Sequence, residues 1–130
     1  MNIRIEVPML PPREYSPNWR GHWSQRLRAG KYYRQAVYYS ALEAGNKLTE
    51  AGGKLPLMWA QLDLTFVFPE ERIRDEDNHR ARFKPGQDAL VTAGLLAGDD
   101  PAHLRMGKIA IEVDKARAPL TVIELKEVVS

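Results

Sequence analysis

The stretch that decides the fold class is Met58-Trp59-Ala60-Gln61-Leu62-Asp63-Leu64-Thr65-Phe66-Val67-Phe68. Every second residue in it, from Met58 to Phe68, is apolar. Because successive side chains of a strand point to opposite faces, this alternation predicts a long β-strand with one fully apolar face. Pro69 ends the strand. An apolar face has to be covered, so the flanking segments are expected to supply partner strands and a helical layer.

Further strands and a long helix are expected on both sides of this stretch. Apolar residues alternate again in residues 2–8, 108–114 and 119–129, which are predicted to be strands. A helix is predicted from Ser24, its expected N-cap, to about Glu50. The residues that recur there at helical spacing are Ala29, Tyr33, Ala36, Ser40, Ala44 and Leu48.

A second helix is expected over about residues 78–93, with Pro85 marking either its start or a kink, and Gly94 ending it. Prolines between residues 8 and 23 exclude regular structure, so that segment is expected to be a loop. The resulting order is β-loop-α-β-α-β-β. It predicts a single α+β domain over residues 1–130, with a small mixed sheet of about four strands and two main helices.

Composition narrows the class of protein. Of the 130 residues, 44% are hydrophobic and 28% are charged, as in an ordinary globular domain. No apolar run is long enough to span a bilayer and the N-terminus lacks a signal-peptide pattern, so we expect a cytoplasmic protein with no membrane partner. The chain has no cysteine, which excludes disulfides and thiolate metal sites. Any metal site would use oxygen or histidine donors, which favours Mg²⁺ and also allows Mn²⁺.

Residues 13–34 are strongly basic and rich in aromatic side chains. The basic residues are Arg13, Arg20, Arg26, Arg28, Lys31 and Arg34, and Glu14 is the one acid among them. The interleaved aromatic residues are Tyr15, Trp19, Trp23, Tyr32 and Tyr33. Such a segment suits phosphate contacts together with stacking on exposed bases. It equally suits a solvated amphipathic helix whose aromatic side chains lie in the core.

Acidic residues gather at two places that can carry chemistry. Asp75 and Asp77 lie two residues apart, and in an extended segment both carboxylates would point the same way. Asp99 and Asp100 follow the second helix, and if the chain folds back, three carboxylates could meet in a Mg²⁺ site suited to phosphodiester hydrolysis. A nearby lysine, Lys84, would stabilise charge on the phosphate. The alternative is that the aspartates only form turns and helix caps, with Asp77 or Asn78 as N-cap, and that Lys84 is a solvated surface residue.

These clusters, taken in order, resemble the RusA family of Holliday junction resolvases of phages and prophages. The matching residues are Arg74-Asp75-Glu76-Asp77-Asn78, Phe83-Lys84-Pro85-Gly86-Gln87-Asp88-Ala89-Leu90, Ala93-Gly94-Leu95-Leu96 and Asp99-Asp100. The N-terminal Pro11-Pro12 and Ser16-Pro17-Asn18-Trp19-Arg20 are similar to the proline-rich opening of that family. The likeness extends over about residues 1–115. A single D-x-D is a weak signal, whereas this ordered series at these spacings is specific.

The resemblance implies a homodimeric, Mg²⁺-dependent endodeoxyribonuclease that cleaves four-way DNA by paired symmetric nicks in recombination and repair. Its metal-binding acids correspond to Asp75, Asp77 and Asp100, with Asp99 as the alternative to Asp100, and its catalytic lysine corresponds to Lys84. Five residues separate Asn78 from Lys84, more than in the shorter family form, so Arg80 and Arg82 are the next candidates for the role of the lysine.

Two other functions remain compatible with these residues. One is a nuclease of the same family that acts on other branched DNA, and the other is a DNA-binding module without catalysis. A plain structural protein whose aspartates are turns and caps is a third alternative. The residues expected to contact DNA are Asn18, Arg20, Arg26, Arg28, Lys31, Arg34, Arg74 and Asn78.

Overall fold

The computed structural model describes residues 1–72 and 74–129 as one α+β domain. Its sheet has four strands in the order β1-β4-β2-β3, with β2 and β3 parallel and the other neighbours antiparallel. The strands are β1 (Asn2–Val7), β2 (Ala60–Phe68), β3 (Leu104–Val113) and β4 (Leu120–Glu127). The expected α+β class with a small mixed sheet is therefore confirmed.

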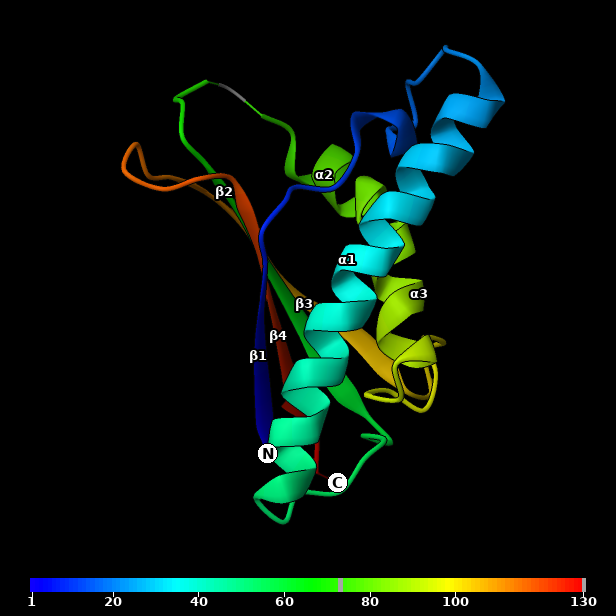
Figure 1. The fold of residues 1–130 in the computed structure, drawn as a ribbon, viewed down its shortest axis with the longest axis vertical. Coiled ribbons are helices and arrows are strands. Elements are labelled where there is room, and N and C mark those ends of the chain that lie inside the picture. The colour runs from blue at the N-terminus through cyan, green and yellow to red at the C-terminus, as the bar shows by residue number, and fades with distance from the viewer. Residues whose placement is uncertain (73, 130) are drawn as a thin grey trace.

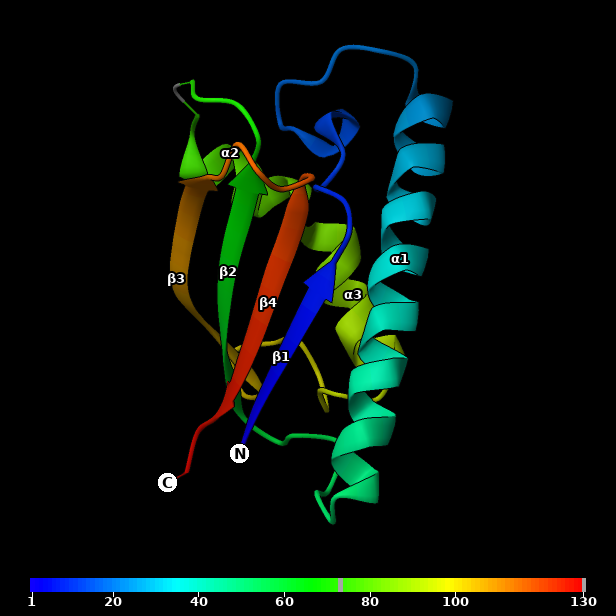
Figure 2. The ribbon, with the colours of Figure 1, turned by 60° about the vertical axis from the view of Figure 1, so that its left-hand side comes forward.

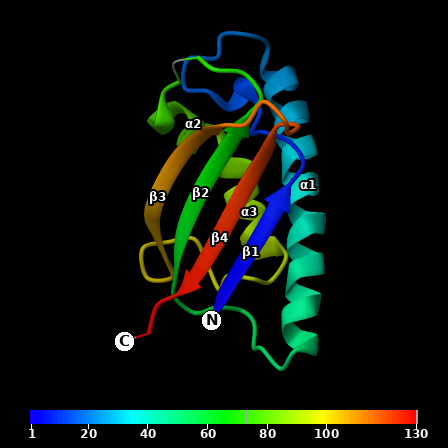
Figure 3. The same ribbon diagram turned by 90° about the vertical axis from the view of Figure 1, so that its left-hand side faces the viewer.

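The helices lie on one face of this sheet (Figure 2 and Figure 3). They are α1 (Trp23–Glu50), α2 (Glu76–Arg82) and α3 (Lys84–Thr92), and a single 3-10 turn, η1 (Arg13–Tyr15), precedes them. Within the described ranges, no helix covers the opposite face of the sheet, which faces the viewer in Figure 3. The core therefore lies between the sheet and the layer of α1 and α3.

Residues 58–68, which decide the fold class, contain the central strand β2, and the predicted apolar face of this strand is largely buried. Ala60, Leu62, Leu64 and Phe66 are each at most 1% exposed. Met58 lies before the strand begins and is 63% exposed. Burial of these side chains on β2 against the helices supplies the main hydrophobic stabilisation of the domain.

Helix α1 differs from the prediction in its N-cap and in its buried stripe. The N-cap is His22, not Ser24, because the His22 Nδ1 accepts a hydrogen bond from the Ser24 backbone N–H at 3.1 Å. The fully buried positions are Gly30, Tyr33, Val37, Ala41 and Gly45. Two of them are glycines, whose missing side chains allow close packing but are invisible to a hydrophobicity pattern.

The predicted second helix is in fact two helices, and Pro85 starts the second of them. Proline has no N–H to donate to the carbonyl four residues earlier, so α2 cannot continue through it. Phe83 serves as the C-cap of α2 and the N-cap of α3, and its side chain is 1% exposed. The break lets α2 and α3 point in different directions while Phe83 anchors both in the core.

Strand β3 begins at Leu104, earlier than the predicted residue 108. Its register against β2 shifts between Leu62 and Leu64, where the partners change from Met106 to Ile109. This irregularity breaks the alternation of apolar residues, which is why the sequence pattern detected only the second half of the strand.

Candidate functional site

A cleft of about 640 Å³ lies where the N-terminal loop and α1 meet α2 and α3. Two of the predicted catalytic residues, Asp77 and Lys84, are among the residues that line it. The full lining consists of Tyr15, Pro17, Arg26, Asp77, Arg80, Ala81, Lys84 and Gln87. The cleft is therefore the place where the acidic cluster and the lysine share one surface.

Asp75 caps α2, and this changes the expected geometry of the Asp75–Asp77 pair. One carboxylate oxygen of Asp75, Oδ1, accepts hydrogen bonds from the backbone N–H groups of Asp77 at 2.9 Å and Asn78 at 3.3 Å. Asp77 lies in the first turn of α2. The prediction that Asp75 and Asp77 belong to one extended segment is therefore wrong. Among the described residues, the Asp77 carboxylate has no hydrogen-bond or ion-pair partner, which leaves it available to the cleft.

Asn78 and His79 hold the start of α2 in place. The Asn78 amide donates from Nδ2 to the buried Ser16 Oγ at 2.8 Å, which ties the proline-rich loop to α2. The His79 ring packs against Phe66 and Phe68, and its Nδ1 donates to the Asp75 carbonyl at 2.8 Å. Burial lowers the pKa of His79, so the ring stays neutral beside Asp75. No local sequence pattern indicated this supporting role of His79, because the aromatic rings it packs against come from β2.

Lys84 lies between two carboxylates. Its Nζ is 2.9 Å from Asp88 Oδ1 on the next turn of α3 and 2.9 Å from Asp99 Oδ2 in the following loop. Gln87 also donates to Asp99, at 3.3 Å. The hydrogen bonds to Asp88 and then Asp99 raise the pKa of Lys84, and the hydrogen bond from Lys84 lowers the pKa of Asp99. Lys84 is thus held as an ammonium group at the edge of the cleft.

Asp100 is paired with His103 and not with Lys84. Its carboxylate accepts from His103 Nδ1 at 2.9 Å and from the backbone N–H of Ala102 at 2.9 Å. The hydrogen bond from His103 lowers the pKa of Asp100. Of the two adjacent acids, Asp99 is therefore the one that reaches Lys84.

The expected meeting of three carboxylates is not present in the structure. Within residues 1–72 and 74–129, no three histidine or acidic side chains are grouped closely enough to hold a metal ion. The donor chemistry nevertheless fits Mg²⁺, because Asp77 offers an unpaired carboxylate to the cleft and Asp75 caps its helix through one oxygen only. A third carboxylate from Asp99 or Asp100 would have to exchange its present partner.

The predicted DNA-contacting residues fall into two groups. Asn78 and two arginines are already held by the protein: Asn78 by Ser16, as described above, the Arg26 guanidinium 4.3 Å from the centre of the Tyr15 ring, and that of Arg74 3.6 Å from the centre of the Phe68 ring. Arg26 also donates to the Glu14 carbonyl at 3.1 Å. The exposed members are Asn18, Arg20, Arg28, Lys31 and Arg34.

Arg80 and Arg82, the alternative candidates for the role of Lys84, differ in their position relative to the cleft. Arg80 lines the cleft, whereas Arg82 does not. The Arg82 Nε is buried without a hydrogen-bond partner, and burial lowers the pKa of Arg82. Arg80 is therefore the better placed of the two to contact a phosphate in the cleft.

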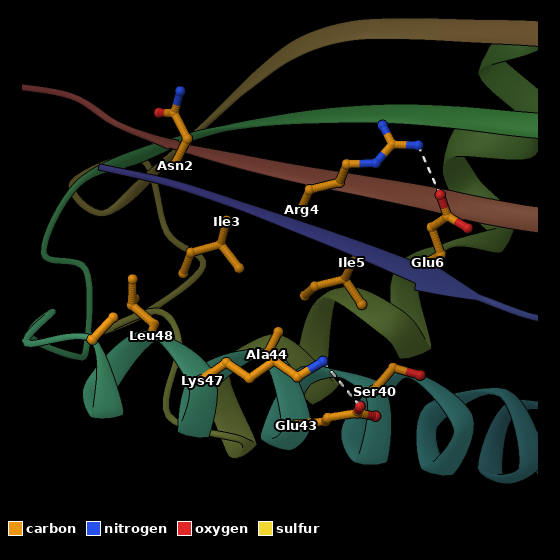
Figure 4. A pocket seen from close by; sticks show the side chains of 11 residues that line it. Asn2, Ile3, Arg4, Ile5, Glu6, Ser40, Glu43, Ala44, Lys47 and Leu48 are labelled. Atoms are coloured by element: carbon orange, nitrogen blue, oxygen red, sulfur yellow. Dashed lines mark hydrogen bonds and ion pairs between the residues drawn. The ribbon is translucent and has the colours of Figure 1, made fainter.

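A second hollow, of about 480 Å³, lies between β1 and α1 and contains no predicted site residue. Ile3 and Ile5 point from β1 toward Ala44 and Leu48 of α1, and ion pairs such as Glu43–Lys47 lie on its rim (Figure 4). Its charged side chains are paired as Arg4–Glu6 and Glu43–Lys47, and the rest of its lining is mainly aliphatic.

No helix among the described residues is both long and apolar enough to cross a membrane. No family model matches the chain. A protein of Xylella fastidiosa (strain Temecula1), described only as uncharacterized, is 38% identical over 108 residues. The matched region covers 82% of this chain and 66% of that protein, so the chain spans just under two thirds of the length of this relative.

Proposed function

We propose that this protein is a Mg²⁺-dependent endodeoxyribonuclease of the RusA family that resolves Holliday junctions by paired symmetric nicks. The observation that carries the proposal is the shared cleft: Asp77 of α2 and Lys84 of α3 line the same surface, beside the basic side chain of Arg80. A carboxylate with no partner, a fixed ammonium and an arginine are the groups that metal-assisted hydrolysis of a phosphodiester requires.

The order of the motifs supports the same function. The D-x-D-N residues 75–78 start α2, Lys84-Pro85 starts α3, and Asp99-Asp100 follows in the loop that returns to the sheet. The first two motifs thus each begin a helix, and the third lies in the loop between α3 and β3. The contact between Lys84 and Asp99 links the second and third motifs directly.

In this proposal Mg²⁺ is held by Asp75, Asp77 and one acid of the Asp99–Asp100 pair. When bound there, Mg²⁺ supplies a bound water of lowered pKa and polarises the phosphoryl oxygen. Lys84 stabilises negative charge that builds on the phosphoryl oxygens, and its raised pKa keeps it protonated for that role. Asn78 and His79 keep α2 in position, and Arg80 orients the phosphate.

The substrate and the assembly are part of the proposal. Four-way DNA has two symmetric strands to be nicked, which suits a homodimer with one cleft per protomer. The exposed basic residues Arg20, Arg28, Lys31 and Arg34 supply phosphate contacts. A phage or prophage gene expressed in a bacterial cytoplasm is the corresponding setting. A related nuclease that prefers other branched DNA would use the same cleft.

A DNA-binding module without catalysis is the second candidate. It is favoured by the pairing of Lys84 with both Asp88 and Asp99. In the part of the chain that the structure describes, no three histidine or acidic side chains form a group that could hold a metal ion. In that case the protein would bind branched DNA but leave it intact with any divalent cation.

The test is cleavage of a synthetic four-way junction with and without Mg²⁺, comparing the parent with Asp77→Asn. We expect the parent to cut two strands symmetrically with Mg²⁺ and Asp77→Asn to lose cleavage but retain or improve binding, because one carboxylate that repels phosphate is gone. Glu76→Gln is the matched control, since it removes a charge from the same exposed turn and should change the rate by no more than a few-fold. Full activity of Asp77→Asn, or an inactive parent protein, would contradict the proposal.

A further inference from the structure

The first two turns of α1 carry apolar side chains that the fold does not use. Trp23 is 67% exposed and Leu27 is 57% exposed. Figure 1 and Figure 2 show that these turns extend beyond the ends of the strands, on the side of the molecule where α2 lies. Leaving a tryptophan and a leucine in water at the tip of a helix costs hydrophobic free energy, which a binding role would offset.

The structure leaves Trp23 and Tyr32 exposed, at 67% and 65%, and holds the other three aromatic residues of the basic segment against the protein. Tyr33 is fully buried and donates to Thr121 Oγ1 at 2.9 Å, so it belongs to the core. Tyr15 lies under the Arg26 guanidinium, and the indole N–H of Trp19 is buried. The Trp23 ring is exposed to solvent, and the His22 ring lies beside it with 5.4 Å between the ring centres.

The position of Trp23 relates it to the cleft. Residues three and four apart are neighbours on a helix surface, so Trp23 lies next to both Arg26 and Leu27. Arg26 lines the cleft that contains Asp77 and Lys84. His22 caps the helix, so the Trp23 backbone is the first position of α1, three residues before the cleft residue Arg26.

The charge around Trp23 identifies the chemistry of its partner. From Trp23 to Leu42 the helix has no acidic residue, and Arg28, Lys31 and Arg34 are exposed, with no ion-pair partner among the described residues. A helix N-terminus is normally stabilised by acids, and the first turn of α1 contains none. A polyanionic partner accounts for that pattern, and an exposed indole among cations suits the face of a nucleobase.

We propose that Trp23, with Leu27 as an apolar neighbour, forms a stacking platform for the bases at the branch point of the DNA. In an open junction the base pair at the branch loses a stacking neighbour, so one ring face is exposed to water and the indole can cover it. This inference rests on the proposed function, since it assigns to the same cleft the means of selecting branched over linear DNA.

The experiment measures binding without divalent cation, so that it is independent of cleavage. A four-way junction carries 2-aminopurine beside the branch, and a linear duplex carries it in the same sequence. Trp23→Ala is expected to weaken junction binding roughly ten-fold, the scale of one base-stacking contact, with little effect on the duplex, and to abolish the quenching of 2-aminopurine. Trp23→Phe should retain most of the junction affinity and most of the quenching of 2-aminopurine.

Tyr39→Ala is the matched control, because Tyr39 is also 67% exposed but lies four turns further along the same helix. Trp23→Leu separates base stacking from contact with a second copy of this chain, because leucine keeps apolar area but cannot stack on a base. Sedimentation of each variant reports the oligomeric state.

Equal junction binding by Trp23→Ala and the parent, or full binding by Trp23→Leu, would overturn the inference. So would dissociation of a dimer in Trp23→Ala together with equal losses on junction and duplex. A parent protein that cleaves while Trp23→Ala binds normally leaves the proposed function standing. A parent protein that binds through Trp23 without cleaving in Mg²⁺ supports the platform and contradicts the nuclease.

Discussion

Lys84 is the residue whose substitution tests the proposed catalytic mechanism most directly. A lysine that acts on the charge of the phosphoryl group should affect the rate of cleavage more than binding, because that charge builds in the transition state. We expect Lys84→Ala to lower the single-turnover rate on saturated junction by on the order of 10²–10³. Lys84→Arg should recover only part of it, since a planar guanidinium does not replace an ammonium between Asp88 and Asp99.

The control for Lys84 is Lys47→Ala. Lys47 is likewise paired with an acid on its own helix, Glu43 at 3.3 Å, but it lies on the rim of the hollow beside β1. Its removal should leave the rate unchanged. If Lys84→Ala cleaves within a few-fold of the parent, Lys84 is a surface residue and Arg80 becomes the candidate to replace in the same assay.

Asp75 has two roles that different substitutions separate. Asparagine is as good an N-cap as aspartate, whereas alanine leaves the Asp77 and Asn78 N–H groups without their acceptor. We expect Asp75→Asn to lose cleavage with an unchanged midpoint of urea unfolding. Asp75→Ala should lose cleavage and also about 0.5–2 kcal/mol of stability. Retained Mg²⁺-dependent cleavage in Asp75→Asn would restrict Asp75 to the capping role.

At the scale of the element, the basic half of α1 should determine how DNA binding depends on salt. Each phosphate contact contributes about 0.9 to the slope of log K against log salt on duplex arms. Arg28→Ala/Lys31→Ala should therefore reduce that slope by up to about 2. Arg26→Ala should instead disturb the loop, because Arg26 holds Tyr15 and the Glu14 carbonyl.

The matched control for the slope is Arg4→Ala/Arg117→Ala. Both arginines are paired with Glu6, on the sheet side of the molecule. Titrations of junction binding at several salt concentrations compare the two double variants. An unchanged slope in Arg28→Ala/Lys31→Ala shows that this half of α1 does not face the DNA.

At the scale of the whole molecule, Asp63 connects three strands of the sheet. It is 6% exposed on β2, pairs with Lys126 of β4 at 2.7 Å, and accepts from the backbone N–H of Lys108 on β3 at 2.8 Å. Gly107 is required beside it, because a Cβ there would overlap the Asp63 carboxylate. This network holds the irregular register of β3 against the central strand.

The pH dependence of stability follows from that network. Burial acts to raise the pKa of Asp63, but the hydrogen bonds from Lys126, Lys108 and Gln61 outweigh it and the pKa is lowered. A carboxyl whose folded pKa is depressed stabilises the fold above its unfolded pKa, near 3.9, and loses that contribution as pH falls through the folded value. The parent should therefore lose stability below about pH 4.

Asp63→Asn tests this contribution. We expect it to lower the free energy of unfolding at pH 7 by roughly 1–3 kcal/mol, the scale of hydrogen bonds to a charged group. It should also flatten the fall of stability below about pH 4, as measured by urea titrations at several pH values. Glu50→Gln, at the exposed end of α1, is the control. The same acid dependence in Asp63→Asn and the parent would exclude Asp63 as its source.

The sequence alone determined the features that have a local period or a local chemical cause. The alternation in residues 58–68 predicted β2, helical spacing predicted α1, and the missing N–H of Pro85 predicted either a helix start or a kink, of which the structure shows the start. Asp77 and Lys84, which the sequence singled out as candidate site residues, line the same cleft. These predictions succeeded because each depends on neighbours within a few residues along the chain.

Only the tertiary structure decided which distant groups meet. Asp99, rather than Asp100, pairs with Lys84, in a loop that pairs through Leu96 with Leu57, three residues before β2. The pattern of β2 did not show that Asp63 would be buried, because its partners come from β3 and β4. Trp23 is open and Tyr33 is in the core although both fit the same basic segment, because α1 extends beyond the sheet at one end and packs on it along the rest. Contacts of this kind depend on the path of the whole chain, which a local pattern does not contain.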